Sequence, residues 1–381
     1  MAEQLRRRLT FAAYRGAAAV ARNLPGPVAA EVAAGVAMLF AYARPARRAL
    51  VASHLRRIAG DGLGGGDLDR AVDRVFRSYG RYWAESFRLH VTPPDELVRA
   101  MTTDGLEHLD AALAQGRGAI LALPHLGGWD FGGAWLTSIG YPTTVVVEPL
   151  EPPELFEWFA SLRQGSGLFV VPMGSGAPAA LIAALRRNEV VGLVSDRDLG
   201  GRGVPVEIFG EQTTLPAGPA LLSLRTGAPV LPAAVYAWPS GMHRSVVRPP
   251  LPVPGPGHLS RRVAVMTGSL ATELEVLIRR APDQWHLLQP NWPSDLGSRA
   301  TGQGDIAPLR GSGARGSGAR GSGARGTGAR GSGARGSGAG GAGVTTPQRT
   351  GTPGLSAPAT AAEPSGWPDG AGLSGTGPAA G

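Results

Sequence analysis

Short apolar runs alternate with longer segments of helical periodicity from about residue 103 to residue 293. The apolar runs are expected to be strands, because they are short and bounded by Gly, Pro or polar residues. Alternation of this kind predicts an α/β domain with a mainly parallel central sheet flanked by helices. The expected strands span residues 118–123, 143–148, 168–172, 190–195, 204–209, 229–236 and 244–249, and the expected helices include residues 131–139, 178–187, 216–225 and 262–280.

The residues before this domain have the spacing of helices. Arg8, Arg15 and Arg22 recur every seven residues and form one basic stripe. A basic stripe beside apolar residues is typical of a helix that lies on an anionic bilayer, although the solvated face of an ordinary surface helix fits the stripe equally well. The sequence therefore predicts a helical, membrane-associating region over residues 1–92, followed by the α/β domain over residues 93–293.

The composition changes sharply after Trp292. Residues 294–381 contain few apolar residues, and residues 310–339 repeat Arg-Gly-Ser/Thr-Gly-Ala. A tract that buries so little cannot offset the entropy of ordering, so this C-terminal tail is expected to be disordered. It lacks the interleaved aromatic residues that stack on bases, so no nucleic-acid partner is expected. An anionic membrane surface and a solvated linker remain open as its roles.

Cysteine is absent, which excludes a disulfide and any thioester formed on the enzyme. Residues 1–293 contain no Gly-x-Ser-x-Gly motif, which argues against a serine acyl-enzyme. Arg15 and Arg22 interrupt the apolar run that a secretory leader would need, and residues 28–42 are too short to span a bilayer. The chain is therefore expected to stay in the cytoplasm.

A histidine follows the first central strand. Residues 122–133 run Ala-Leu-Pro-His-Leu-Gly-Gly-Trp-Asp-Phe-Gly-Gly, so Pro124 ends the strand and His125 lies at its exit. Gly127 and Gly128 allow a tight turn and leave space beside the imidazole. A histidine with a carboxylate in reach, here Asp130, has the chemistry of a general base with an orienting partner. A packing histidine at a strand end is the alternative.

A second strand leads into carboxylates in the same way. Residues 190–199 run Val-Val-Gly-Leu-Val-Ser-Asp-Arg-Asp-Leu, so Asp196 and Asp198 flank Arg197 at the strand's exit. Ligands of such sheets bind beyond the carboxyl ends of the strands, where His125 is also expected. Local pairing with Arg197 on a loop is the alternative role for both carboxylates, and it competes more seriously for Asp198.

The His-x4-Asp spacing resembles the signature of glycerolipid acyltransferases. The blocks at residues 190–199, 203–210, 214–220, 225–232 and 282–286 follow in order. Together they resemble the lipid A acyltransferase-like branch, and most closely the actinobacterial phosphatidylinositol mannoside acyltransferases. The resemblance covers roughly residues 100–293.

The resemblance implies a role for several residues. His125 would be the catalytic base, Asp196 its orienting carboxylate, and Asp130 a support of the turn. Glu148 would be a further polar residue of the active site, with a solvated strand end as its alternative. The guanidinium groups that would hold the phosphates of acyl-CoA belong to Arg163, Arg202 and Arg225.

The reaction implied is direct transfer of a fatty acyl group, palmitoyl in this resemblance. It would move from acyl-CoA to a mannose hydroxyl of phosphatidylinositol mannoside at the cytoplasmic face of the plasma membrane. The developing oxyanion would need backbone amides near Gly127 and Gly128, or an arginine. Acyl-CoA is a co-substrate, and no metal or other cofactor is expected. The alternatives are another glycolipid or lysolipid acceptor, and a non-catalytic lipid-binding protein of the same fold.

Overall fold

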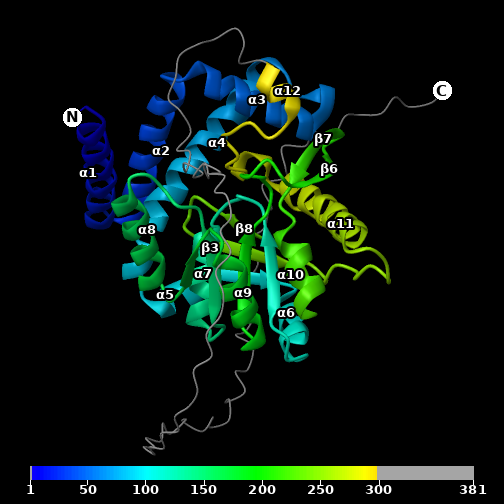
Figure 1. Ribbon diagram of the computed structural model, residues 1–381. Helices are drawn as coiled ribbons and strands as arrows, with labels where there is room; N and C mark the ends of the chain where they lie inside the picture. Colours follow the sequence, from blue (N-terminus) through cyan, green and yellow to red (C-terminus); the bar gives the residue numbers. More distant parts are fainter. Residues whose placement is uncertain (1, 298–381) are drawn as a thin grey trace, which may run out of the picture. The chain divides into compact units, whose positions relative to one another are not determined.

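A seven-stranded sheet lies at the centre of the computed structural model, which describes residues 2–297 (Figure 1). The strand order is β1-β9-β8-β2-β5-β3-β4, and only the β8–β9 pair is antiparallel. The predicted α/β fold with a mainly parallel sheet is therefore confirmed. The strands are β1 (Met101–Asp104), β2 (Ala119–Leu123), β3 (Thr143–Val147), β4 (Phe169–Pro172), β5 (Val190–Val194), β8 (Val230–Ala237) and β9 (His243–Val247).

Three strands differ from the prediction: one lies outside the central sheet, and two were not expected. The expected strand at residues 204–209 is β6 (Val204–Ile208), which lies outside the central sheet and forms an antiparallel hairpin with β7 (Glu211–Leu215). Alternate residues of β6 are buried, as in a strand with one covered face, whereas β2 is buried almost throughout. The edge strand β1 was not predicted, because its Met-Thr-Thr-Asp sequence has no apolar run.

Helices cover both faces of the sheet, and each face has its own apolar core (Figure 1). One face packs against α9 (Ala177–Arg186), α10 (Gly218–Thr226) and α11 (Leu259–Arg280). The other face packs against α5 (Pro94–Arg99), α6 (Leu106–Leu113) and α7 (Trp129–Ser138). This two-sided covering explains why the central strands are continuous apolar runs rather than alternating ones.

The N-terminal region is helical, as its spacing predicts, and it packs onto the domain. Its helices are α1 (Ala2–Asn23), α2 (Gly26–Tyr42), α3 (Pro45–Ala59) and α4 (Gly65–Ser86). Helices α2 and α4 cross closely at Gly80, where a side-chain Cβ would come within 2.4 Å of the Ala33 carbonyl oxygen. Because α4 is held in this way, its side chains Ser78, Tyr82 and Ser86 reach residues at the edge of the sheet.

The packed chain extends past residue 293, where the tail was expected to begin. A short helix, α12 (Pro293–Gly297), comes after α11, and its residue Asp295 is 4% exposed. Helix α8 (Pro153–Gly165) lies between β3 and β4 in the chain. The predicted boundary is therefore too early, because Ser294 and Asp295 make polar contacts with α3. The Arg-Gly repeat at residues 310–339 lies outside the described residues.

Between residues 2 and 297, no individual helix combines the length and the apolar character that a membrane span requires. Helices α2 and α3 satisfy the length and composition test only when taken together, and the chain bends by 102° between them.

Candidate active site

Two neighbouring parallel strands, β2 and β5, each lead into a titratable residue at the same edge of the sheet. The strands pair so that Leu123 lies opposite Val194. His125 and Asp196 both come two residues later, so the register of the sheet brings them side by side. The His125 Nδ1 and the Asp196 Oδ1 are 2.6 Å apart. The structure thus joins the two residues that the resemblance paired.

Both oxygen atoms of the Asp196 carboxylate accept hydrogen bonds. Oδ1 accepts from the His125 ring, while Oδ2 accepts from the His125 backbone N–H at 2.9 Å and from the Trp285 indole N–H at 2.7 Å. An ionised carboxylate can only accept, so the proton on the His125 ring lies on Nδ1. The Nε2 of the neutral ring then carries the lone pair that can take a proton from a substrate.

Burial and hydrogen bonding act in opposite directions on Asp196, whose residue is 1% exposed. Burial raises the pKa of this carboxyl, but its interactions with the His125 ring, the His125 backbone N–H and the Trp285 indole outweigh burial, so the pKa lies below its usual value. Asp196 is therefore ionised at neutral pH. The nearby His286 differs, because burial lowers its pKa to about 3 and keeps it neutral.

The glycine turn after His125 is needed for packing against β8. Gly127 has a φ of 59°, and a Cβ there would meet the Val235 carbonyl oxygen at 2.1 Å. The Gly127 N–H donates to the Gln284 carbonyl, and the Gly128 N–H donates to the Val235 carbonyl, each at 2.9 Å. These two amides are thus already paired within the protein, contrary to the expectation that they face an oxyanion. The space beside Gly127 is also occupied by protein atoms.

Asp130, the second acid of the first motif, holds helices together instead of contacting His125. It lies in the first turn of α7 and accepts from the Tyr82 hydroxyl of α4 at 2.7 Å. Arg163 of α8 donates to both carboxylate oxygens, at 2.9 and 2.8 Å. Asp130 therefore joins α4, α7 and α8, and the support of the turn that the resemblance implied for it stays a prediction.

The other two predicted acids lie on the loops beside the site. Glu148, at the end of β3, accepts from Arg197 at 3.1 Å. Asp198 does not pair with Arg197 but accepts from the backbone N–H groups of Gly200 and Gly203 and from the Thr214 hydroxyl. Asp198 therefore folds its loop onto the β6–β7 hairpin, which is a different local role from the one considered from sequence.

The three arginines expected at the acyl-CoA site occupy three different environments. Arg163 lines the cavity next to His125, but its guanidinium is held by Asp130. Arg225, in the last turn of α10, is exposed and lines the same cavity. Arg202 is exposed on the loop before β6 and lies outside the cavity lining. Only Arg225 therefore combines exposure with a place in the cavity wall.

The cavity that opens beside His125 has a volume of about 1040 Å³. Its polar lining residues include His125, Glu148 and Arg197. Its apolar lining belongs to the cores on both faces of the sheet. Under α7 the lining residues include Leu121, Trp135 and Leu136, and toward α9 and α10 they include Leu181, Ile182 and Leu222.

Comparison with known proteins agrees with this architecture. A family model described as bacterial lipid A biosynthesis acyltransferase matches residues 3–294. The chain belongs to this family. It is 42% identical over 224 residues to the phosphatidylinositol mannoside acyltransferase of Mycobacterium tuberculosis (strain H37Rv), which is 58% of this chain and 69% of that protein.

Two further relatives are also named as lipid acyltransferases. The phosphatidylinositol mannoside acyltransferase of Mycolicibacterium smegmatis is 38% identical over 232 residues, covering 60% of this chain and 74% of the relative. The lipid A biosynthesis acyltransferase of Haemophilus influenzae is 26% identical over 224 residues, covering 57% and 67%. Together they support acyl transfer to a lipid as the activity of this chain.

Sequence reasoning missed two residues that hold the acyltransferase site. Trp285 donates to the Asp196 carboxylate, and Asn291 donates its side-chain amide to the Asp196 backbone carbonyl at 3.3 Å. Trp285 lies in the block at residues 282–286 that carried part of the resemblance, so the block itself was a signal. Asn291 had no such signal, because a polar residue near a composition change resembles a loop.

We expect Asp130→Asn to destabilise this acyltransferase by roughly 3 kcal/mol, because it leaves the buried Arg163 without its charge partner. Denaturant unfolding of the full chain measures the change. Asp67→Asn is the matched control, since it breaks an ion pair with Arg70 that is exposed on both sides and should change stability little. Equal stability of the two variants would show that the Asp130–Arg163 pair does not hold the helices.

Proposed function

We propose that this chain transfers a fatty acyl group from acyl-CoA to a mannose hydroxyl of phosphatidylinositol mannoside, with His125 as the general base. The observation that carries the proposal is the Asp196-bound imidazole in the wall of a large apolar cavity. Pockets for small ligands span about 300–1,000 Å³, so this cavity has room for a long acyl chain. The names of the mycobacterial relatives supply the proposed acceptor class.

In the proposed reaction, the acceptor hydroxyl attacks the thioester carbon while the His125 Nε2 takes its proton. The Asp196 carboxylate stabilises the imidazolium that forms. The C–S bond then breaks, an ester is left on the acceptor, and the proton passes from His125 to the departing thiolate of CoA. Since Gly127 and Gly128 are paired within the protein, an arginine of the cavity wall is the proposed donor to the oxyanion.

The three arginines have different proposed roles in binding acyl-CoA. Arg163 serves Asp130, so it is proposed to act through the helices that it joins rather than on a CoA phosphate. Arg225 has an exposed guanidinium at the cavity wall, which suits a phosphate of the donor. Arg202 is exposed and could meet only a part of CoA that extends outside the cavity.

His125→Ala should abolish acyl transfer, because a positioned base is worth about 10² to 10⁴ in rate. Asp196→Asn should also lower turnover, because the amide no longer stabilises the imidazolium. The assay follows acylated phosphatidylinositol mannoside by mass spectrometry, with fatty acyl-CoA as donor. Asp198→Asn is the control, because that carboxylate contacts the loop and not His125. Near-normal turnover by His125→Ala would contradict the mechanism, and acylation of other lipids alone would contradict the acceptor.

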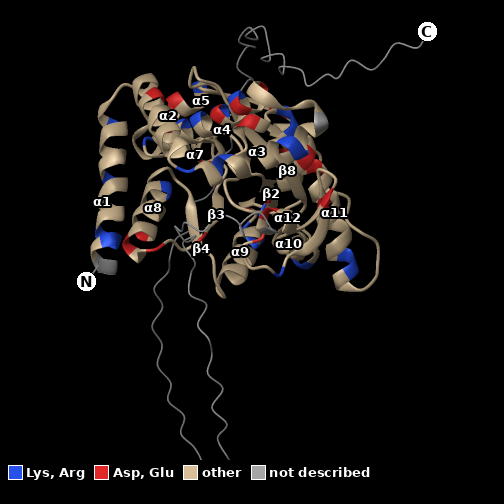
Figure 2. Ribbon diagram, turned by 90° about the horizontal axis from the view of Figure 1, so that it is seen from above, with Lys and Arg blue, Asp and Glu red and all other residues tan. Residues whose placement is uncertain are grey.

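We also propose that the protein acts as a peripheral protein on the cytoplasmic face of the plasma membrane. Helix α2 has one charged residue, Glu31, so its ribbon is mostly tan in Figure 2. Its exposed large apolar side chains include Val28, Val32, Val36 and Leu39. The basic residues of the stripe on α1 are also exposed. Apolar side chains can enter the lipid boundary while arginines meet anionic headgroups. The acceptor lipid would then reach the site from the bilayer.

Val36→Asp should weaken binding to vesicles that contain phosphatidylinositol by about tenfold, because an apolar side chain of 60% exposure is replaced by a charge that repels anionic lipid. Sedimentation with vesicles measures the binding. Val265→Asp on α11, where the valine is 51% exposed, is the matched control. Acyl transfer in detergent should be unchanged in both variants. Equal binding by the two variants would exclude α2 as the contact surface.

A further inference from the structure

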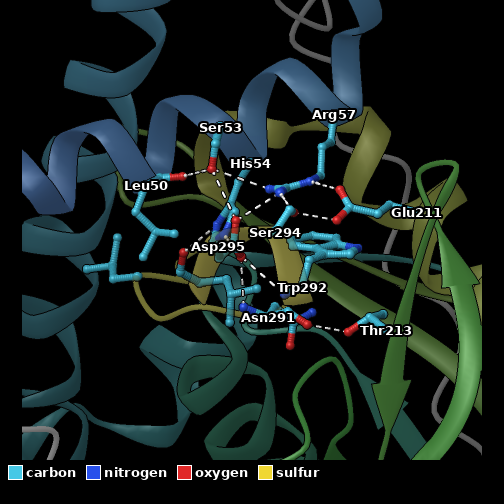
Figure 3. A network of polar contacts seen from close by, with 12 residues as sticks. Leu50, Ser53, His54, Arg57, Glu211, Thr213, Asn291, Trp292, Ser294 and Asp295 are labelled. Carbon is cyan, nitrogen blue, oxygen red and sulfur yellow. Dashed lines mark hydrogen bonds and ion pairs between the residues drawn. The ribbon is translucent and has the colours of Figure 1, made fainter. Parts of the chain in front are cut away.

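The segment after Trp285 returns across the N-terminal helices and buries a carboxylate there. Asp295 of α12 lies against α3, as Figure 3 shows. Its Oδ2 accepts from the His54 Nε2 at 3.1 Å and from the backbone N–H groups of Asn291 and Trp292 at 2.9 and 3.1 Å. Its Oδ1 lies 2.9 Å from a guanidinium nitrogen of Arg57. A carboxylate this well supplied with donors fixes the fold of the segment around it.

His54 contacts this carboxylate from α3. Its Nδ1 lies 3.1 Å from the Leu287 carbonyl oxygen, and its Nε2 faces Asp295. Both of these oxygen atoms are acceptors, so a ring with a proton on each nitrogen satisfies both contacts. Burial raises the pKa of the Asp295 carboxyl, but the hydrogen bonds from His54 and the backbone bring it well below its usual value. The two residues are 2% and 4% exposed, and they form an ion pair when the ring carries both protons.

This pair is connected to Asp196 by two routes. Asn291, whose backbone N–H is bound by Asp295, donates its side-chain amide to the Asp196 carbonyl oxygen. Trp285, which donates to the Asp196 carboxylate, packs against the ring of His54 with centroids 5.9 Å apart. Asp196 is thus held at its backbone and at its side chain by residues that the ion pair fixes.

A buried ion pair is weak evidence for stability, because desolvation of both charges offsets most of their attraction. The contacts of Asp295 instead join the backbone of Asn291 and Trp292 to His54 on α3. The imidazole of His125 must point its Nε2 at the substrate, and the hydrogen bond between its Nδ1 and the Asp196 carboxylate sets that direction.

We propose that His54 and Asp295 are positioning residues for the Asp196–His125 couple. The pair would hold Trp285 and Asn291 where they fix the Asp196 carboxylate. The proposal rests on the function proposed above, because it assigns the pair a role in the same proton transfer. It gives the N-terminal helices a part in the chemistry, since His54 lies on α3.

A neighbouring contact provides a matched control. Arg57 and Ser294 bind Glu211 on the outer side of this cluster (Figure 3). Glu211→Gln removes the negative charge that Arg57 contacts at residue 211, but it leaves the hydrogen bonds of Asp295 with His54 and Asn291 in place. A general loosening of α12 would affect both variants, whereas the positioning role belongs to Asp295 alone.

Asp295→Asn in the full chain should lower kcat by about tenfold or more, because a small misplacement of catalytic groups has effects of this size. The KM values for acyl-CoA and for the acceptor should change little, because the pair does not touch either substrate. The indole N–H proton resonance of Trp285, assigned with Trp285→Phe, should shift in the same variant. Glu211→Gln should leave kcat and this resonance unchanged.

If Asp295→Asn does not fold, Asn291→Ala decides by the same criteria, because it removes only the amide that reaches Asp196. A kcat equal to that of Glu211→Gln, or a parallel rise of both KM values at unchanged kcat, would overturn the proposal. Absence of acyl transfer by the wild-type chain would instead refute the proposed function. In that case the Trp285 resonance still tests whether the ion pair holds the indole.

Discussion

The rest of the site depends on the ionised carboxylate of Asp196 inside the protein. A buried carboxylate needs hydrogen-bond donors, and here they come from His125 and Trp285. Asn291 binds the backbone carbonyl of the same residue. These residues belong to segments far apart in the chain. The hydrogen bonds to Asp196 therefore connect the edge of the sheet to the C-terminal segment. The direction of the His125 ring follows from that convergence.

The α/β class, most of the strands of the sheet and the exits of β2 and β5 could be predicted, because a buried strand followed by a glycine turn or by acids is a local pattern. The adjacency of β2 and β5 could not, because strand order depends on pairing across the whole domain. Polar partners from distant segments were beyond sequence reasoning for the same reason. His54 meets Asp295 across 241 residues, and nothing near His54 distinguishes it from a core residue of α3.

Some charged residues near the cavity pair with each other and others stay exposed, and composition could not reveal which. The resemblance implies that Arg163 binds acyl-CoA, and the His-x4-Asp spacing by itself favours Asp130 as the partner of the base, yet the two residues bind each other. Two opposite charges that are removed from water gain most by pairing, so burial decides their role. Arg225 stays at the exposed end of α10, where an anionic donor can still reach it. Whether an arginine binds substrate therefore depends on its neighbours.

The central claim of this account is that the imidazole of His125 removes a proton and does not itself carry the acyl group. The most direct measurement is the intact mass of the protein during turnover with fatty acyl-CoA, with and without the acceptor lipid. The account predicts an unchanged protein mass, with CoA and acylated acceptor formed in equal amounts and only when the acceptor is present. A protein that gains the mass of one acyl group, and then passes that group to the acceptor, would contradict it.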